Sequence, residues 1–404
     1  MGSNEYLERF ADLVVRVGAN VLPGSGVVLR ADTAHLEIAR AVVECAYAAG
    51  AEWVEVEWSD GPIRLSRLTH ASMESLTRSR PWALERIKSW SADRVVSIAL
   101  TGNPNPHLFD GIEPARKAAI AVEEAMAAQD AIIGQQLRWT VVAAPNPGWA
   151  TEVFGEPDVE RLWEAVATAM CLDEADPVAR WRQRAAELIA RARGLDALEL
   201  TQVQLRGPGT DLVVGLLPDS RWTGGSQADP GGVVHMPNIP TEEVFTSPDR
   251  RQADGEITLT KPVIVAGQLV EGLRATFAGG RITDVTATAG VEAVRAQLDT
   301  DEGARSLGEV ALVDRESRIA KAGILFHNTL FDENAACHVA WGNSFPFAVA
   351  GGLEKTSDER YELGLNRSAV HTDVVVGGDG INVTATGPGG TVEILRDDEW
   401  VLGL

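Results

Sequence analysis

The sequence has few cysteines and no long apolar run, and each absence excludes a class of protein. Its three cysteines, Cys45, Cys171 and Cys337, are far apart and odd in number, so they predict neither a disulfide framework nor a thiolate metal site. No stretch reaches the roughly 18 uninterrupted apolar residues that a membrane-spanning helix requires. The first residues do not combine a basic start with an apolar run, as a signal peptide does. We therefore expect a soluble, cytoplasmic protein without a membrane partner.

Basic residues are also scarce relative to acidic ones. Lysine and arginine number 36 against 58 aspartates and glutamates, which gives a formal net charge of -22 at pH 7. A surface of this sign repels the phosphate backbone, so we expect no nucleic acid partner. The hydrophobic fraction of 45% and the charged fraction of 23% are typical of a folded globular protein. A chain of 404 residues is too long for one ordinary core and predicts two domains.

Strand-like and helix-like patterns alternate through the first half of the chain. Short apolar or alternating segments that predict strands lie at 27–29, 53–58, 95–100 and 140–143. Segments with helical spacing lie between them, at 33–49, 81–90 and 114–128. Alternation of this kind predicts a mainly parallel sheet with helices on both faces. We assign residues 1–190 to this α/β domain.

The pattern changes after a helical stretch at 158–193. Beyond residue 195 the sequence consists of short β-rich segments separated by glycine, proline and aspartate turns, with one helix expected near 291–297. This arrangement predicts an α+β domain with a twisted, largely antiparallel sheet. We assign residues 191–404 to this second domain.

Candidate metal ligands are concentrated in the second domain. His327, His338 and His371 lie within one short window. His371 and Asp373 would share one face of a strand, because side chains alternate along a strand, and that geometry suits chelation of a hard or borderline cation. Carboxylates that could complete a mixed nitrogen and oxygen site lie in turn-like segments at Glu242, Glu243, Glu309 and Asp314. A His-x-Asp pair alone is more often a hydrogen-bonded surface pair than a ligand pair.

Four segments carry a resemblance to a known family. They read NIPTEEVFTSPD (238–249), GEVALVD (308–314), NTLFDENAACHVAWGNSFP (328–346) and GLNRSAVHTD (364–373). In this order they resemble the aminopeptidase T and aminopeptidase S family of metallo-aminopeptidases, and the first residues of the chain resemble the opening of the same family. The resemblance implies a homodimer. In it the N-terminal domain would form dimer contacts and the cavity wall, and the C-terminal domain would be the catalytic, metal-binding one.

The resemblance also implies a ligand set and a reaction. The matching positions for two divalent ions of zinc, cobalt or manganese are Glu243, Glu309, His338, His371 and Asp373. Glu309 would bridge the ions, and Glu309 or Glu243 would also carry the catalytic proton. A hydroxide between the two metals would attack the carbonyl of the first peptide bond, releasing N-terminal residues from a peptide or small amide substrate.

One position departs from the family pattern. The family's ligand set includes a tyrosine seven residues after the first histidine, and this chain has Phe345 there. We expect Phe345, Glu333, Asn334 and Arg367 to line the substrate cavity. We expect His327, which follows Phe326 in an apolar stretch, to be a hydrogen-bonded core residue on a strand.

Three alternatives follow from that departure. The same fold could hydrolyse a non-peptide amide. It could also be an Fe(II) ring-cleaving dioxygenase, in which His338, His371 and Asp373 form a two-histidine, one-carboxylate site. A third alternative is a metal-binding scaffold without catalysis. The peptidase hypothesis is favoured over the oxygenase because an iron triad has no need of Glu243 and Glu309.

Overall fold

The computed structural model describes residues 3–119 and 122–403. The chain forms two compact units, which we call the N-terminal unit (1–183 and 226–240) and the C-terminal unit (184–225 and 241–404). The segment 226–240 thus returns to the N-terminal unit from the middle of the chain. The division into an α/β domain at residues 1–190 and a catalytic, metal-binding α+β domain at residues 191–404 stays a prediction.

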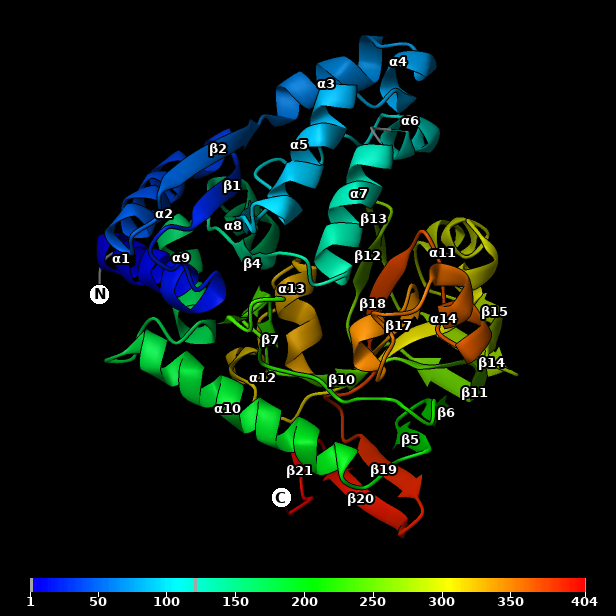
Figure 1. Ribbon diagram of the computed structural model, residues 1–404. Coiled ribbons are helices and arrows are strands. Elements are labelled where there is room, and N and C mark those ends of the chain that lie inside the picture. The colour runs from blue at the N-terminus through cyan, green and yellow to red at the C-terminus, as the bar shows by residue number, and fades with distance from the viewer. Residues whose placement is uncertain (1–2, 120–121, 404) are drawn as a thin grey trace. The chain divides into compact units, whose positions relative to one another are not determined.

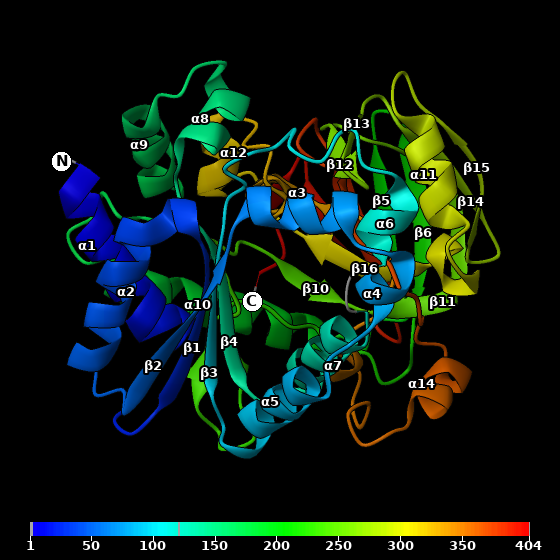
Figure 2. The same ribbon diagram turned by 90° about the horizontal axis from the view of Figure 1, so that it is seen from above.

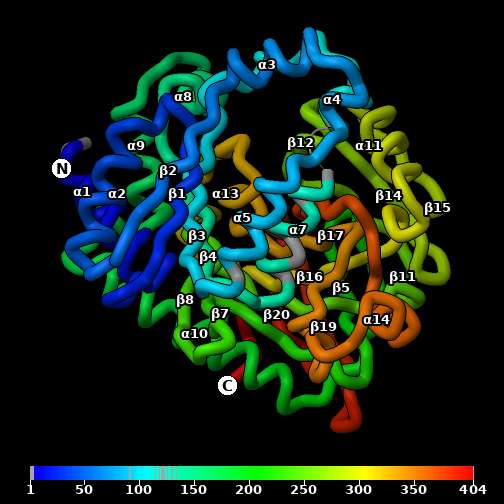
Figure 3. Tube along the Cα trace, turned by 45° about the horizontal axis from the view of Figure 1, so that its top comes forward, coloured from blue at the N-terminus to red at the C-terminus, as the bar shows by residue number. Residues whose placement is uncertain are grey.

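A parallel sheet forms the centre of the N-terminal unit. Its strands, in the order β2-β1-β3-β4-β9, all run in the same direction. They are β1 (Gly26–Asp32), β2 (Trp53–Ser59), β3 (Val96–Thr101), β4 (Arg138–Ala143) and β9 (Asn238–Ile239). The returning segment supplies β9 and the small hairpin of β7 (Gln227–Ala228) and β8 (Val234–His235), and this hairpin lies next to β4 (Figure 3).

Helices cover both faces of this sheet, as the alternating pattern predicted. Helices α1 and α2 lie on one side of it and α5 and α7 on the other (Figure 2). Ile87 and Trp90 of α5 pack with Val28 of β1, which is why this strand is apolar on both faces. The helices are α1 (Ser3–Leu13), η1 (Val14–Gly18), η2 (Thr33–His35), α2 (Leu36–Ala48), α3 (Gly61–His70), α4 (Met73–Thr77), α5 (Pro81–Ala92), α6 (Pro114–Ala118), α7 (Val122–Ile133), α8 (Pro147–Phe154) and α9 (Val159–Ala169).

The C-terminal unit contains two larger antiparallel sheets, as expected for the second domain. An eight-stranded sheet has the order β15-β14-β11-β6-β5-β19-β20-β21, and a four-stranded sheet has the order β10-β16-β17-β18. The first is built from β5 (Gln202–Gly207), β6 (Thr210–Leu216), β11 (Pro248–Thr258), β14 (Arg274–Ala278), β15 (Arg281–Thr286), β19 (Asn382–Gly387), β20 (Gly390–Arg396) and β21 (Glu399–Trp400). The second is built from β10 (Val244–Thr246), β16 (Leu307–Leu312), β17 (His338–Gly342) and β18 (His371–Val375).

A hairpin of β12 (Val263–Val265) and β13 (Gln268–Val270) and several helices complete this unit. The helices are α10 (Pro177–Asp196), which begins in the N-terminal unit, α11 (Val291–Leu298), η3 (Glu302–Arg305), α12 (Arg318–Ala322), α13 (Thr329–Asp332), η4 (Glu333–Ala335), η5 (Pro346–Ala348) and α14 (Ser357–Leu363). Helix α11 matches the helix expected near 291–297 and lies beside β15 (Figure 1). Among the described residues, none of the helices has the length and apolar character needed to cross a bilayer.

One face of the four-stranded sheet belongs to the main core of the C-terminal unit. Val310 of β16, Val339 and Trp341 of β17 and Val374 of β18 are fully buried on this face, in one cluster with the strands of the eight-stranded sheet. Burial of these side chains fixes the position of the sheet, and therefore of the residues on its other face.

We expect replacement of Val339 by alanine to lower the free energy of unfolding by about 2 kcal/mol or more, because two buried methyl groups are lost and a cavity remains. The matched control is Val401→Ala in the same unit, where the side chain is 39% exposed and the change should stay within about 0.5 kcal/mol. Urea unfolding followed by far-ultraviolet circular dichroism measures both. Equal midpoints for the two variants would contradict this account of the core.

Candidate metal centre

The second face of the four-stranded sheet carries four of the predicted ligands. Glu309 on β16 is paired with Ala340 on β17, which is paired with Asp373 on β18. Paired residues project to the same face, and so do residues two apart in one strand. His338 lies two residues before Ala340, and His371 two residues before Asp373. The ladder therefore directs all four side chains to the same side.

Glu243 reaches this group from the edge of the sheet. It directly precedes β10, whose residue Val244 pairs with Leu312 of β16. Asn334, which is fully buried, fixes this segment, because its Oδ1 accepts a hydrogen bond of 2.6 Å from the backbone N–H of Glu242. Its Nδ2 donates to the carbonyl oxygen of Leu330 at 3.0 Å. Asn334 thus joins the segment that carries Glu243 to the turn that carries Glu333.

Small residues separate the ligands on the sheet. Ala340 lies between Glu309 and Asp373, and Gly342 is paired with His371. Gly342 has a φ of 103°, and a Cβ atom at this position would lie 2.0 Å from the carbonyl oxygen of Val370. A larger side chain at Ala340 would point to the ligand face and fill the space between the carboxylates.

The donor atoms form two groups that share Glu309. In one group, His338 Nε2 lies 3.0 Å from Glu243 Oε2 and 3.9 Å from Glu309 Oε1. In the other, His371 Nε2 lies 3.2 Å from Glu309 Oε2 and 3.4 Å from Asp373 Oδ1. Within each group the donor atoms lie within 4.8 Å of one another. Glu309 therefore directs one carboxylate oxygen toward each imidazole.

Backbone carbonyls set the orientation of both imidazoles. His338 Nδ1 lies 3.2 Å from the carbonyl oxygen of Ala336, and His371 Nδ1 lies 2.8 Å from that of Asn343. With Nδ1–H donating to a carbonyl, Nε2 is the nitrogen left to face the carboxylates. Histidines that bind metals in proteins are commonly held in this way.

Without a cation, this cluster of predicted ligands brings several carboxylates close together in a buried place. Burial raises the pKa of Glu309 to about 7, with the nearby carboxylates of Glu243 and Asp373 adding to the effect. Burial, followed by the charges of Asp373 and Glu243, also raises the pKa of Glu333 well above its usual range. Four carboxylates in a small buried volume repel one another, and two divalent cations would offset that repulsion.

The pKa values of the two histidines are raised as well, and in an imidazole this favours the charged form. Burial alone would lower the pKa of His338, but the hydrogen bond and charge of Glu243, with the charges of Glu309 and Asp373, raise it to about 10. The pKa of His371 is likewise raised well above its usual value, because Asp373 and Glu309 outweigh burial. His371 in turn holds the pKa of Asp373 below its usual value, although burial opposes this. Protons on the two imidazoles thus supply positive charge that bound metal ions would otherwise supply.

The donor set fits divalent metal ions. It combines imidazole nitrogens with carboxylate oxygens, the chemistry that zinc, cobalt and manganese accept. Glu243 Oε2 is buried and lies 3.0 Å from His338 Nε2. A buried carboxylate is costly unless a cation, either the protonated imidazole or a metal ion, lies against it.

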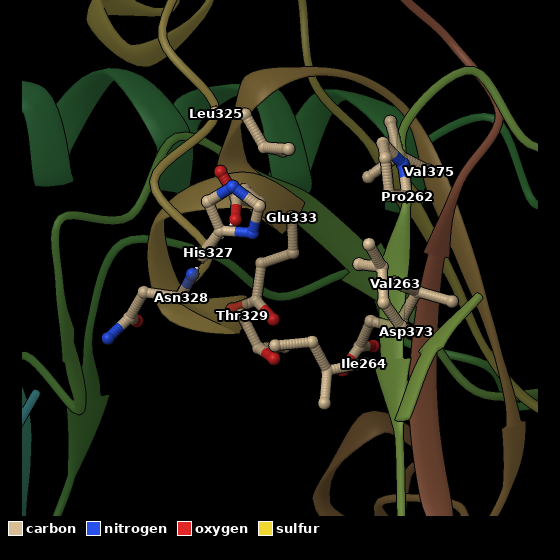
Figure 4. A pocket seen from close by; sticks show the side chains of 12 residues that line it. Pro262, Val263, Ile264, Leu325, His327, Asn328, Thr329, Glu333, Asp373 and Val375 are labelled. Carbon is tan, nitrogen blue, oxygen red and sulfur yellow. Dashed lines mark hydrogen bonds between the residues drawn. The ribbon is translucent and has the colours of Figure 1, made fainter. Parts of the chain in front are cut away.

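A pocket adjoins the predicted ligands, and two residues that were expected to belong to the site line it. Its polar side includes Glu333 and Asp373, and Figure 4 shows both side chains reaching into it. His327 also lines this pocket, so its expected place on an apolar strand is wrong. It lies in a loop with a φ of 51°, because Asp332 accepts hydrogen bonds from the backbone N–H groups of Phe326 and Asn328 and bends the chain there. Asp332, which follows His327 in the sequence, is the residue from which this loop could have been predicted.

Phe345 and Arg367, which were also expected to line the substrate cavity, do not line this pocket. The ring of Phe345 lies beside the imidazole of His371, with centroids 5.0 Å apart. Arg367 is not brought into the group, because its guanidinium pairs with Asp358 at 2.8 Å and is largely exposed.

The other candidate carboxylates have different partners. Glu242 binds Arg184 through two contacts of 2.6 and 2.7 Å. Asp314 pairs with Arg191 at 2.5 Å. Neither belongs to the two donor groups.

Comparison with known proteins supports the same chemistry. Residues 3–400 match the family described as thermophilic metalloprotease (M29). The chain is 37% identical to aminopeptidase PepS of Streptococcus thermophilus and 37% identical to aminopeptidase T of Thermus thermophilus, and each match covers 98% of both chains. The solved structure of wild-type AmpT from Thermus thermophilus superposes with a TM-score of 0.90 at 36% identity, covering 99% of this chain and 100% of that one.

We expect metal binding to release protons and to strengthen as the pH rises. The pKa of His338 is about 10 and that of His371 is also raised, so both are protonated at neutral pH before metal binds. A metal must displace those protons, and each displaced proton makes the apparent affinity up to about tenfold higher per pH unit. Calorimetric titration with Co²⁺ or Mn²⁺ at pH 6.5 and 7.5, in buffers of different ionisation enthalpy, measures the release. Equal affinity at both pH values without proton release would contradict this view.

Proposed function

We propose a mechanism from the premise that the chain belongs to the thermophilic metalloprotease (M29) family and is a metal-dependent aminopeptidase, a hydrolase that removes N-terminal residues from peptides. The observation that carries the proposal is the position of Glu309, which directs one carboxylate oxygen toward each of the two imidazoles.

We assign one divalent ion to each donor group. Glu243 and His338 would hold the first, and His371 and Asp373 the second, with Glu309 shared between them. Zinc, cobalt or manganese would suit these donors. Bound there, such ions would polarise the scissile carbonyl and would lower the pKa of the attacking water.

The protein's own groups would align the site and move the proton. The carbonyl oxygens of Ala336 and Asn343 keep both imidazoles in place, so their Nε2 atoms need no reorientation. We assign the transfer of the water proton to the leaving amine to Glu243, or to Glu309 in a double role. Glu243 is favoured because, among the described residues, an imidazole contacts one of its oxygens, Oε2, whereas an imidazole faces each oxygen of Glu309.

The alternative iron site is less well supported. It needs His338, His371 and Asp373 around one ion, but the donor groups divide these residues, with His338 beside Glu243 and the other two together. Hydrolysis of a non-peptide amide would use the same ligands. The similarity to named aminopeptidases favours peptides over such amides.

Location and oligomeric state form part of the proposal. An acidic chain with few, widely separated cysteines suits a reducing compartment, so we propose the cytoplasm. The homodimer rests on the family resemblance, and light scattering coupled to size-exclusion chromatography tests it.

We expect the protein to bind two equivalents of Co²⁺, Zn²⁺ or Mn²⁺ and to release p-nitroaniline from leucyl p-nitroanilide only with metal. Glu309→Gln should lower kcat by at least about 10²-fold, because the charge shared by both ions is lost. Glu316→Gln is the control, since Glu316 is exposed and pairs with Lys321. His371→Ala should bind about one equivalent. Full turnover in Glu309→Gln, or one equivalent in the unmodified protein, would refute the shared-ligand site.

We expect Phe345→Tyr to raise kcat by about tenfold or more. Phenylalanine cannot donate a hydrogen bond to developing negative charge, and one such donor contributes roughly 10²–10³ in rate in other hydrolases. Phe347→Tyr is the matched control, because Phe347 stacks on Phe345 with centroids 5.3 Å apart. A rise of the same size in both variants, or a fall in Phe345→Tyr alone, would show that the hydroxyl has no such role.

A further inference from the structure

The pocket beside Asp373 has an apolar wall that the mechanism does not use. Val263, Ile264 and Leu269 of the β12–β13 hairpin form much of this wall, and its other residues are Pro262, Leu325 and Val375. Ile264 and Leu269 are cross-strand partners in this hairpin, and they are 47% and 44% exposed. Figure 4 shows Val263 and Ile264 on the same side of the pocket as Asp373. An exposed aliphatic pair next to a metal ligand is a natural contact for an apolar group of the substrate.

The turn of the hairpin holds this wall in a defined position. Ala266 and Gly267 both have positive φ, at 50° and 79°. Two such residues between Val265 and Gln268 match the two-residue turns whose twist suits antiparallel strands. The register of Ile264 against Leu269 is therefore set before any ligand binds.

The polar side of the pocket contains one carboxylate without another assigned function. Three acidic residues line it. Asp373 belongs to a metal-binding group, and both oxygens of Asp332 accept backbone hydrogen bonds, of 2.8 Å from Phe326 and 2.9 Å from Asn328. Glu333 remains, held weakly by Asn334 Nδ2 at 3.4 Å from its Oε1.

We infer that this pocket binds the N-terminal residue of the substrate, with Glu333 accepting the α-ammonium group and the β12–β13 hairpin contacting an aliphatic side chain. The inference rests on the proposed aminopeptidase function. It assigns the substrate class as peptides that begin with leucine, methionine or a similar apolar residue. Glu333 is a binding residue here, and it would restrict cleavage to chains with a free amine.

Charge explains why other N-terminal residues should be poorer substrates. An acidic side chain would meet Glu333 and Asp373 directly. A basic side chain would lie along the aliphatic wall, while the carboxylate nearest to it is already engaged by the α-ammonium. Alanine fits without repulsion but contacts little of the wall. We therefore expect kcat/KM for leucyl substrates to exceed that for alanyl substrates by about tenfold or more, and to exceed that for aspartyl and arginyl substrates further.

The wall is tested by Ile264→Asp in the metal-loaded protein. This variant should lower kcat/KM for leucyl p-nitroanilide at least tenfold. It should also raise the ratio of kcat/KM for the arginyl substrate to kcat/KM for the leucyl substrate by the same factor or more. Val401→Asp is the matched control, at an exposed aliphatic residue of the same unit that does not line the pocket. Equal effects in both variants, or a wild-type preference for arginyl or aspartyl substrates, would overturn the inference.

Binding of 3-methylbutylamine, measured by calorimetry on the metal-loaded protein, tests Glu333 independently of turnover. Glu333→Gln should weaken this binding at least tenfold, and Ile264→Asp should weaken it more than it weakens binding of ethylamine. Unchanged amine affinity in Glu333→Gln would overturn the role of Glu333. If the wild-type protein hydrolyses no anilide, the proposed function fails. The amine titration still shows whether the pocket binds an ammonium group through Glu333. If it hydrolyses anilides without these shifts, only the pocket assignment fails.

Discussion

Repulsion among buried carboxylates is the constraint on which the rest of the site depends. Glu243 and Glu309 are 6% and 4% exposed, and Asp373 and Glu333 lie near them. A protein keeps such a group together only if its backbone is rigid and cations reduce the charge. The four-stranded sheet provides the rigidity, because its other face is anchored in the aliphatic core of the C-terminal unit. The core and the ligands are thus two sides of the same strands, and neither could be moved without the other.

The local part of this arrangement could be predicted from the sequence. His371 and Asp373 alternate along a strand, and this spacing alone places them on one face. The register that brings Glu309 opposite Ala340 and Ala340 opposite Asp373 joins residues that are 31 and 33 positions apart, and no local pattern reveals it. The residues alone offered four candidate carboxylates, and the family resemblance was needed to select Glu309 and Glu243 from them. The role of Ala340 as a spacer was not predictable, because an alanine in an apolar strand gives no sign of what lies on either side.

The fold was predictable where burial imposed a period. The alternation of strands and helices in the N-terminal unit is of this kind. Helix α3 was not predicted, because it is short and largely exposed: Leu68 is buried, but Ile63 is 73% exposed. Its start was still marked, by Asp60 as an N-cap and by a proline in the first turn. Strand β9 has two residues, too few for any period.

The return of residues 226–240 to the N-terminal unit constrains the order in which the protein can assemble during synthesis. Strand β9 covers the edge of β4, and it is made only after the ribosome has passed α10 and the β5–β6 hairpin. Until then the parallel sheet ends in an open strand edge, which is a template for pairing with other chains. A fragment that stops near residue 183 would keep that edge permanently. For this protein, the N-terminal sheet is completed by translation of a segment that lies beyond the first part of the C-terminal unit.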